Sequence, residues 1–248
     1  MPRYRMLIDS NKCYNCGACI VGCQQRNSVP YGYRRNWVRV DADPDYGFGK
    51  GFQPGGCMQC DAPLCVEACP TQATWKGDDG VVLIDVQRCI GCGACIAACP
   101  YDARYRHPER GTVDKCDYCA SSRHLGIAPA CVQLCPAQVR TFGDASDPSS
   151  EVAQIAAQQT LTYVESPQSP TKPSLAFVGA TTVTNWPRAA ALPSPIAAMR
   201  VVATGVRYLG ALSLFGVIAM FFKQILIPSD DKSGAEIHTP ASGKGEKP

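Results

Sequence analysis

Sixteen cysteines dominate the chemistry available to this chain, and all of them lie between residues 13 and 135 of 248. Thiolates bind soft metal ions and iron–sulfur clusters, and they also form disulfides. The cysteines make an internal repeat of four groups of four, which leaves the back of the chain free of cysteine. The groups are Cys13, Cys16, Cys19 and Cys23; Cys57, Cys60, Cys65 and Cys69; Cys89, Cys92, Cys95 and Cys99; and Cys116, Cys119, Cys131 and Cys135.

The spacing within the groups favours iron–sulfur clusters. Groups one and three are C-x2-C-x2-C-x3-C, the bacterial ferredoxin spacing, and groups two and four have extra residues before the third cysteine. In such runs three cysteines converge on one cluster, and the fourth is expected at the start of a helix, pointing at a second cluster. A proline follows the fourth cysteine in groups two, three and four (Pro70, Pro100, Pro136), where it fits the first position of that helix. Sixteen thiolates therefore predict four four-cysteine clusters.

Zinc and disulfides are the competing interpretations of the cysteines. Four-cysteine zinc sites use two C-x2-C pairs rather than a run of three cysteines followed by a fourth. Disulfides need an oxidising compartment, and residues 1–13 contain neither an apolar signal-peptide core nor twin arginines. Export as the folded passenger of a signal-bearing partner stays possible. A zinc-based interaction module is thus the weaker alternative to an iron–sulfur protein.

Short elements are expected to position the cysteines. Apolar runs that end at Ile8 and Ile84, just before groups one and three, predict strands. Residues 41–56, where Gly, Pro and Asp gather, predict a loop. After the last cysteine, a helix is expected to begin at Pro148 with Asp147 as its N-cap. Residues 165–175 (ESPQSPTKPSL) predict an extended, proline-rich linker.

The stretch 195–228 is apolar and predicts a single transmembrane helix. Residues 208–222 carry no charge, and continuing through Lys223 to Ile227 gives a helix that matches the ~30 Å hydrocarbon core. A buried or interfacial helix is the alternative. The stretch 196–227 contains no histidine, so it cannot bind a bis-histidine haem by itself. The polar residues 229–248 predict a disordered tail.

The charge balance excludes a nucleic-acid binder and points to counterions inside the protein. The formal net charge is only +3, with 18% charged residues. A four-cysteine cubane carries about −2, so four of them would bring the total to about −5. Basic residues of the front half are expected to offset this charge, namely Arg34, Arg35, Arg39, Arg104, Arg106, Arg110, Arg123 and Lys115.

The four-group pattern resembles the iron–sulfur (beta) subunits of the molybdopterin (dimethyl sulfoxide reductase) oxidoreductase superfamily, most of all the polysulfide, thiosulfate and tetrathionate reductase types. The resemblance covers residues 4–180. It is carried by CYNCGACIVGCQQRN, CMQCDAPLCVEACPTQAT, RCIGCGACIAACPYDARY, and KCDYC with PACVQLCPAQVRTFGD.

This resemblance implies that group one shares clusters with group four, and group two with group three. It implies four [4Fe-4S] clusters, with cluster 1 nearest a catalytic subunit and cluster 4 nearest the membrane. The implied ligands are Cys13, Cys16, Cys19 and Cys135 for cluster 1; Cys23, Cys116, Cys119 and Cys131 for cluster 2; Cys57, Cys60, Cys65 and Cys99 for cluster 3; and Cys69, Cys89, Cys92 and Cys95 for cluster 4.

The expected fold is α+β, with two interlocked ferredoxin-like modules, a linker and one C-terminal transmembrane helix. The four-cluster domain is expected over residues 1–146, as modules 1–49 plus 101–146 and 50–100. A helix and linker or docking extension follows over 147–194, then the anchor over 195–228 and the tail over 229–248.

The expected function is non-catalytic electron transfer in a membrane-bound respiratory complex. The sequence has no dinucleotide-binding G-x-G-x-x-G fingerprint and no phosphate-binding loop. Its expected partners are a large catalytic subunit, of molybdopterin type, and a quinone- or haem-bearing membrane subunit. The alternatives are a subunit of a membrane-bound hydrogenase and a free-standing membrane polyferredoxin. The expected location is a bacterial or archaeal cell membrane, on either side of it.

Overall fold

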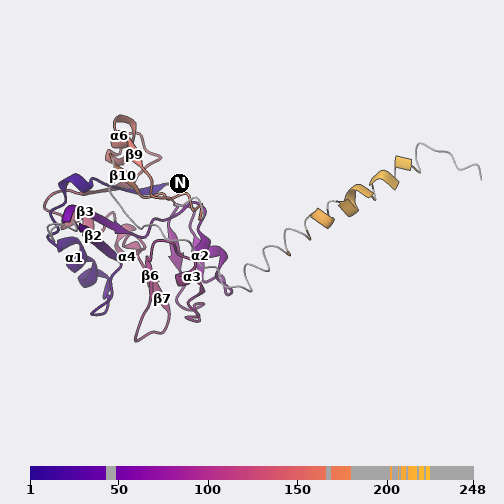
Figure 1. Cartoon of the computed structure of the whole chain (residues 1–248), viewed down its shortest axis with the longest axis horizontal. Coiled ribbons are helices and arrows are strands. Elements are labelled where there is room, and N and C mark those ends of the chain that lie inside the picture. Colours follow the sequence, from indigo (N-terminus) through magenta and orange to yellow (C-terminus); the bar gives the residue numbers. More distant parts are fainter. Residues whose placement is uncertain are drawn as a thin grey trace, which may run out of the picture. The chain divides into compact units, whose positions relative to one another are not determined.

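The structure is a computed structural model, and it describes residues 1–42, 49–165 and 169–179 together with single helical positions between 202 and 223. The protein divides into two compact units, Met1–Ala197 and Ala198–Pro248. All sixteen cysteines lie in the first unit. The sites below are therefore built within this unit alone (Figure 1).

A four-stranded sheet, in the order β8-β1-β10-β9, forms one side of the first unit. Strand β1 (Tyr4–Ile8) runs antiparallel to β8 (Arg140–Asp144) and parallel to β10 (Ala176–Val178), which pairs with β9 (Leu161–Thr162). Apolar side chains of β1 are fully buried, so the strand that the sequence predicts up to Ile8 is confirmed.

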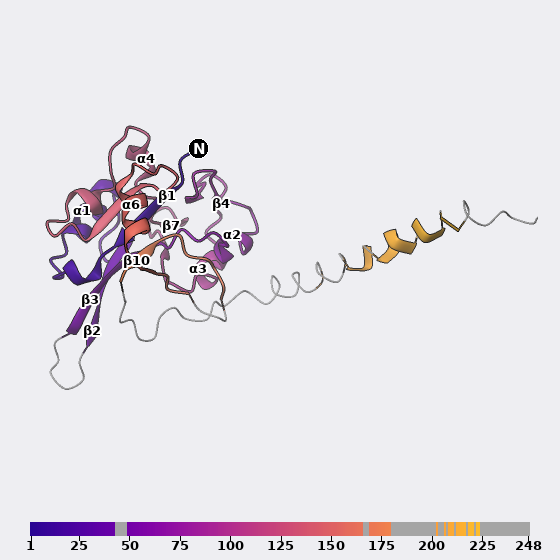
Figure 2. The same ribbon diagram turned by 90° about the horizontal axis from the view of Figure 1, so that it is seen from above.

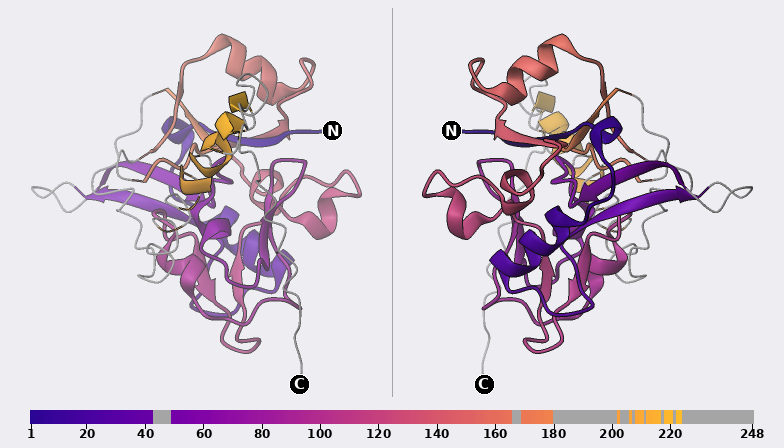
Figure 3. Two further views of the ribbon diagram at one scale, coloured as in Figure 1. Left: turned by 90° about the vertical axis from the view of Figure 1, so that its right-hand side faces the viewer. Right: turned by 90° about the vertical axis from the view of Figure 1, so that its left-hand side faces the viewer.

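Helix α6 (Glu151–Gln158) covers this sheet through Val152, which packs against Leu7 (Figure 3). The predicted helix exists, but its predicted start was wrong by three residues. Ser150 is the N-cap, and its Oγ accepts from the backbone N–H of Ala153 at 3.2 Å. Asp147 instead closes the preceding turn by accepting from the N–H of Ser149 at 2.8 Å. Asp147 and Ser150 are both suitable N-cap residues, and Ser150, which is nearer the apolar face of the helix, is the one that caps it.

Three two-stranded hairpins complete the strands of the described residues. Two of them follow cysteine groups: β4 (Thr74–Lys76) pairs with β5 (Val82–Ile84), and β6 (Arg104–Arg106) pairs with β7 (Val113–Lys115). The strand predicted to end at Ile84 is thereby confirmed.

The third hairpin corrects a sequence prediction, because β2 (Asn36–Ala42) and β3 (Gly49–Gly56) occupy much of the segment predicted as a loop (Figure 2). Its glycine content serves packing. A Cβ atom at Gly55 would lie 2.5 Å from Nε1 of Trp37, so only glycine lets the indole cross the hairpin. Pro54 is tolerated because both strands of a two-stranded hairpin are edge strands.

Each cysteine group contains a helix, and these helices pack in pairs. Helix α1 (Ala18–Asn27) packs against α5 (Ala130–Gln133), and α2 (Leu64–Glu67) packs against α3 (Ala94–Ala97). Groups one and four therefore meet, as do groups two and three. A further short helix, α4 (Ala120–Arg123), follows the second cysteine of group four, and a 3-10 helix, η1 (Ser10–Lys12), precedes Cys13.

The fourth cysteine of a group does not begin a helix, contrary to the sequence prediction. Cys69, Cys99 and Cys135 lie two residues after the ends of α2, α3 and α5, and turns follow them. The proline after each of them ends the helix, because proline lacks an N–H and its ring clashes with the preceding turn. In group one Gln24 replaces the proline, and α1 continues to Asn27.

The segment predicted as a linker over 165–175 is packed where the structure describes it. Thr171 and Leu175 are buried, and the carbonyls of Thr171 and Lys172 accept from the N–H groups of Ala62 and Asp61 at 2.9 and 2.7 Å. The segment thus covers the loop that carries Cys60 and leads directly into β10. The described part of this segment therefore docks on the domain rather than spacing two domains.

Among the described positions of the C-terminal unit, no helix is long and apolar enough to cross a membrane. The described positions between 202 and 223 are helical, and their apolar side chains, such as Leu209 and Phe215, are exposed. The other positions of the predicted anchor over 195–228, and the whole predicted tail over 229–248, lie outside the described residues.

Candidate metal centres

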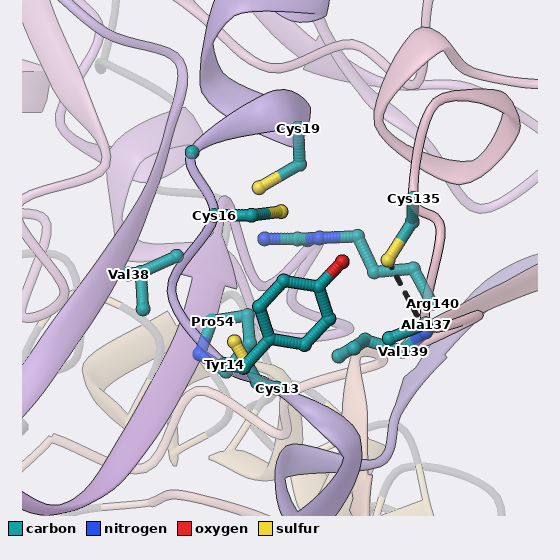
Figure 4. A pocket seen from close by; sticks show the side chains of 11 residues that line it. Cys13, Tyr14, Cys16, Cys19, Val38, Pro54, Cys135, Ala137, Val139 and Arg140 are labelled. Atoms are coloured by element: carbon teal, nitrogen blue, oxygen red, sulfur yellow. Dashed lines mark hydrogen bonds between the residues drawn. The ribbon is translucent and has the colours of Figure 1, made fainter.

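The first site is a pocket of about 330 Å³ that has Cys13, Cys16, Cys19 and Cys135 in its wall. Figure 4 shows three of these side chains on the segment that enters α1 and the fourth coming from the opposite wall, after α5. The backbone N–H of Val139 donates to Sγ of Cys135 at 3.3 Å. The cysteines of cluster 1 thus surround one space, although Cys135 is far from the others in sequence.

The second site is a pocket of the same volume, about 330 Å³, lined by Cys57, Cys60, Cys65 and Cys99. Its wall is completed by apolar side chains, among them Leu64 and Val82. Burial first, and then the neighbouring thiolates of Cys57 and Cys65, raise the pKa of Cys99 to about 11. Burial favours the neutral form of these thiols, and a bound metal centre would supply the positive charge that makes them thiolates.

The cysteines of cluster 2 come together beside α1. The side-chain amide of Asn27 lies 3.6 Å from Sγ of both Cys23 and Cys119, so these two sulfurs face one donor. Burial and the thiolates of Cys131 and Cys119 raise the pKa of Cys23 to about 12. Burial also raises the pKa of Cys116, with Cys23 and Cys131 as the nearest charges.

The cysteines of cluster 4 lie at the other end of the helix pair α2 and α3. Burial raises the pKa of Cys95, and the thiolates of Cys65 and Cys69 act in the same direction. Cys89 and Cys92 lie on the loop that leads into α3, the helix that carries Cys95, and Cys92 is exposed. Sγ of Cys89 accepts from the N–H of Val113 at 3.4 Å. Cys92 gives this site an opening to the surface.

Glycines shape the loop around Cys92, and one of them is sterically required. Gly91 has φ +67°, and a Cβ atom there would lie 2.0 Å from the carbonyl oxygen of Gly111. Gly93 has φ +78° but nothing within 4 Å of its Cβ position. The two positions share a left-handed backbone and differ in the space beside them.

Gly91→Ala is therefore expected to destabilise the protein more than Gly93→Ala. The left-handed backbone costs alanine about 1–2 kcal/mol at both positions, and displacing the Gly111 backbone adds about 1–3 kcal/mol at Gly91 alone. Guanidinium titration of visible absorbance under anaerobic conditions measures the difference. Equal losses for the two variants would contradict the close approach of Gly91 and Gly111.

Hydrogen bonds to sulfur recur after the fourth cysteine of each group. Cys135 accepts from Val139 four residues on, and Cys69 accepts from the N–H of Thr74 at 3.4 Å. In group one, where the helix continues, the donor is a side-chain group instead, the amide of Asn27. N–H donors to sulfur are a principal means by which proteins stabilise ligated clusters. The sequence analysis missed Asn27, although its place four residues after Cys23 was visible.

Asn27 is oriented by a buried ion-pair network. Arg35 donates to Oδ1 of Asn27 at 3.1 Å, which turns the amide nitrogen toward the sulfurs. Arg35 also pairs with Asp114 at 2.7 Å and Asp117 at 3.2 Å. Burial raises the pKa of Asp114, but the charge of Arg35 outweighs it and keeps that pKa below its usual value.

The buried cations overlap only in part with those that the sequence analysis named: Arg104 and Lys115 were named and are buried, whereas the buried Arg140 was not named. Arg35 and Arg123 pair with carboxylates, and Arg106 and Arg110 are exposed. Arg104 and Arg140 are only 5% and 4% exposed, yet the described residues include no carboxylate paired with either. Arg140 was missed, although it stands five residues after Cys135 as Arg104 stands five residues after Cys99.

The residues of these sites fit a [4Fe-4S] cluster. Each pocket brings four sulfurs from two segments around an apolar space, with N–H donors aimed at sulfur and a buried guanidinium beside them. Among the described residues, no three Cys, His, Asp or Glu side chains are placed to hold a single metal ion. The sites thus have the donors of the class of proteins that bind [4Fe-4S] clusters.

Comparison with known proteins gives the family. Residues 50–145 match the 4Fe-4S dicluster domain, and residues 10–32 match a 4Fe-4S binding domain. The B component of tetrathionate reductase from Salmonella typhimurium is 39% identical over 71% of this chain and 72% of its own length. The B component of polysulfide reductase from Wolinella succinogenes is 40% identical over 71% of this chain and 94% of its own length. Protein NrfC of Escherichia coli is 39% identical over 70% of this chain and 79% of its own length.

The protein belongs to this family of iron–sulfur subunits of the molybdopterin oxidoreductase superfamily. It is an electron-transfer protein that carries [4Fe-4S] clusters and not the catalytic subunit of a complex. Its sixteen cysteines are the number that four such clusters need.

Proposed function

We propose that the protein relays single electrons through four [4Fe-4S] clusters between a catalytic subunit and a membrane subunit. The ligand sets are Cys13, Cys16, Cys19 and Cys135 for cluster 1; Cys23, Cys116, Cys119 and Cys131 for cluster 2; Cys57, Cys60, Cys65 and Cys99 for cluster 3; and Cys69, Cys89, Cys92 and Cys95 for cluster 4. The observation that carries this proposal is the convergence of cysteines from two distant groups on one pocket, seen twice.

The exposed cysteines favour a relay over an enclosed redox store. Cys16 of cluster 1 and Cys92 of cluster 4 are exposed, whereas the sets of clusters 2 and 3 contain no exposed cysteine. Electrons can therefore enter beside one of these cysteines and leave beside the other. The protein ends each transfer in the state in which it began, since each electron accepted from one partner passes to the other.

The partners follow from the relatives. Several relatives are named as subunits of tetrathionate, polysulfide and thiosulfate reductases, so the partner of this protein is a large catalytic subunit, of molybdopterin type. A second partner is a membrane subunit that carries quinone or haem. The apolar residues 208–222 would hold the protein at a bacterial or archaeal membrane as a single anchor. Clusters on the outer side would require export with a signal-bearing partner.

Metal analysis of the anaerobically purified full-length protein tests the cluster content. We expect about sixteen iron atoms per molecule and broad visible absorbance that bleaches with dithionite, because four cubanes contain that much iron. About four zinc atoms without iron would refute the proposal and support the zinc interpretation.

Purification of the complex tests the partners. A molybdenum-containing large subunit that co-elutes in fixed ratio from detergent extracts is the expected result. A nickel-containing large subunit would replace this partner with a hydrogenase. Elution of the protein alone, with all its iron, would favour a free-standing polyferredoxin.

A further inference from the structure

Three buried side chains, Arg140, Tyr118 and Arg104, lie where neighbouring cysteine sets approach each other. Each is at most 5% exposed, and each carries a hydrogen-bond donor. None of them is a ligand in the proposed sets. Each of them lies in one of the three gaps between successive clusters: Arg140 between clusters 1 and 2, Tyr118 between clusters 2 and 3, and Arg104 between clusters 3 and 4.

Arg140 lies in the gap between clusters 1 and 2. Its guanidinium reaches into the pocket of cluster 1, as Figure 4 shows. The guanidinium is held from the protein side by the carbonyl oxygen of Gly55 at 3.0 Å. Burial lowers the pKa of Arg140, but the thiolates of Cys131, from cluster 2, and Cys19, from cluster 1, outweigh burial and raise this pKa above its usual value.

Arg104 occupies the equivalent place between clusters 3 and 4. Its guanidinium donates to Sγ of Cys65 at 2.8 Å and to Oγ1 of Thr74 at 3.2 Å. Burial lowers the pKa of Arg104, and the thiolates of Cys65, from cluster 3, and Cys95, from cluster 4, raise it above its usual value. One positive charge therefore faces two cysteine sets here as well.

The guanidinium groups of Arg140 and Arg104 need a compensating negative charge, and the carboxylates of the described residues do not supply it. A guanidinium removed from water is strongly destabilising unless an opposite charge and hydrogen bonds compensate. In the described part of the sequence neither arginine pairs with a carboxylate, whereas Arg35, whose side chain is 11% exposed, pairs with two. Clusters of about −2 charge on either side would supply the missing anions.

Tyr118 lies in the remaining gap, between clusters 2 and 3. Its side chain is 1% exposed, and its hydroxyl has no hydrogen-bond partner among the described residues. Tyr118 follows Cys116 of cluster 2 by two residues, and it packs in the same buried cluster of side chains as Cys57 of cluster 3. The ring of Phe142, at 5.1 Å between centroids, packs edge-on against it and fixes its direction. A buried hydroxyl without a partner is destabilising, and a hydrogen bond to cluster sulfur would remove that cost.

We propose that Arg140, Tyr118 and Arg104 are positioning residues that each raise the reduction potentials of the two clusters beside them and define the path 1–2–3–4. The proposal rests on the proposed ligand sets. In each step one reduced cluster is oxidised and its neighbour takes up that same electron. A donor shared by both clusters shifts the two potentials in the same direction, so it changes the difference between them less than a donor to one cluster alone would.

Redox titration followed by electron paramagnetic resonance of the full-length protein tests this proposal. Arg104→Gln is expected to lower the potentials of clusters 3 and 4 and to leave clusters 1 and 2 unchanged. Arg140→Gln is expected to lower the potentials of clusters 1 and 2 and to leave clusters 3 and 4 unchanged. Each step of the redox titration is assigned to a cluster with a variant of one of that cluster's cysteines. Arg104→Lys, which keeps the charge, is expected to shift the same two potentials less. Unchanged potentials, or a shift of all four, would overturn the proposal.

Two further variants separate the gap effect from general damage. Tyr118→Phe removes only the hydroxyl and is expected to lower the potentials of clusters 2 and 3 by less than the arginine variants do. Arg34→Gln, at an exposed position and with the same change of residue type, is expected to leave all four potentials unchanged. If a glutamine variant loses iron, the potentials measured in Arg104→Lys and Tyr118→Phe decide whether the proposal holds.

The iron content keeps the two proposals distinguishable. If all four clusters are present but their potentials do not change in these variants, the inference about the three residues is wrong and the proposed relay is unaffected. Missing iron in the unaltered protein would overturn the relay itself.

Discussion

Replacing Cys23 with serine is expected to disrupt the cluster that Cys116, Cys119 and Cys131 hold, and to spare the cluster built on the rest of group one. Within α1, Cys23 follows Cys19 by four residues, but its neighbours are Cys119 and Cys131 of group four. Electron paramagnetic resonance should show the signal of cluster 2 lost or converted to a three-iron form. Iron is expected to fall by about one to four atoms per molecule, depending on whether the damaged cluster survives.

Cys16→Ser is the matched control for this experiment. It alters the same cysteine group, yet Cys16 lines the pocket with Cys13, Cys19 and Cys135, so cluster 1 is the one expected to change. Should Cys23→Ser instead alter cluster 1, the shared-ligand arrangement would be wrong, although four clusters could still be present.

Arg35→Met is expected to cost about 3–5 kcal/mol of folding stability, the range for breaking a buried ion pair from one side. The side chains of Arg35 and Asp114 are only 11% and 9% exposed, so the variant leaves this carboxylate with the more exposed Arg110, 3.8 Å away, as its cation. The change also removes the donor to Oδ1 of Asn27 and leaves its amide with the hydrogen bond to the carbonyl of Cys23 at 2.9 Å, so the amide can turn relative to the sulfurs of Cys23 and Cys119. Guanidinium titration should show the earlier transition, and the signal of cluster 2 should broaden or shift.

The double variant Arg35→Met/Asp114→Asn separates these two effects. Asparagine removes the buried charge and can still accept the hydrogen bond from Tyr105, so part of the lost stability should return. The effect on cluster 2 should remain, because Oδ1 of Asn27 still lacks its hydrogen bond from Arg35. No recovery in the double variant would mean that the pair is not the source of the loss.

Local patterns predicted the cysteine chemistry well because the ligand spacing is a property of a few consecutive residues. The strands ending at Ile8 and Ile84 were likewise visible as short apolar runs, and the structure confirms them. The hairpin of β2 and β3 could not be predicted from the sequence, because Gly55 is needed only to make room for Trp37 on the neighbouring strand. Composition alone makes such a segment look like a loop.

The surroundings of the clusters could not be predicted for a related reason. Arg140 is one arginine among many in the sequence, and only its burial without a carboxylate distinguishes it. Asn27 becomes a donor to sulfur only because Arg35 turns its amide. The helix boundaries were misplaced because proline is compatible with both the beginning of a helix and the residue just after its end.

The placement of β1 between β8 and β10 has a consequence for the newly made polypeptide. The first strand needs residues up to Asp144 for one neighbour and up to Val178 for the other. At about 5–20 residues per second, a ribosome takes about 9–36 s to deliver them. Until then the N-terminal segment has unpaired edges, and the stretch around Thr171 has not yet covered the loop that holds Cys60. Cluster 3 is therefore enclosed late in synthesis, after its four cysteines have all emerged.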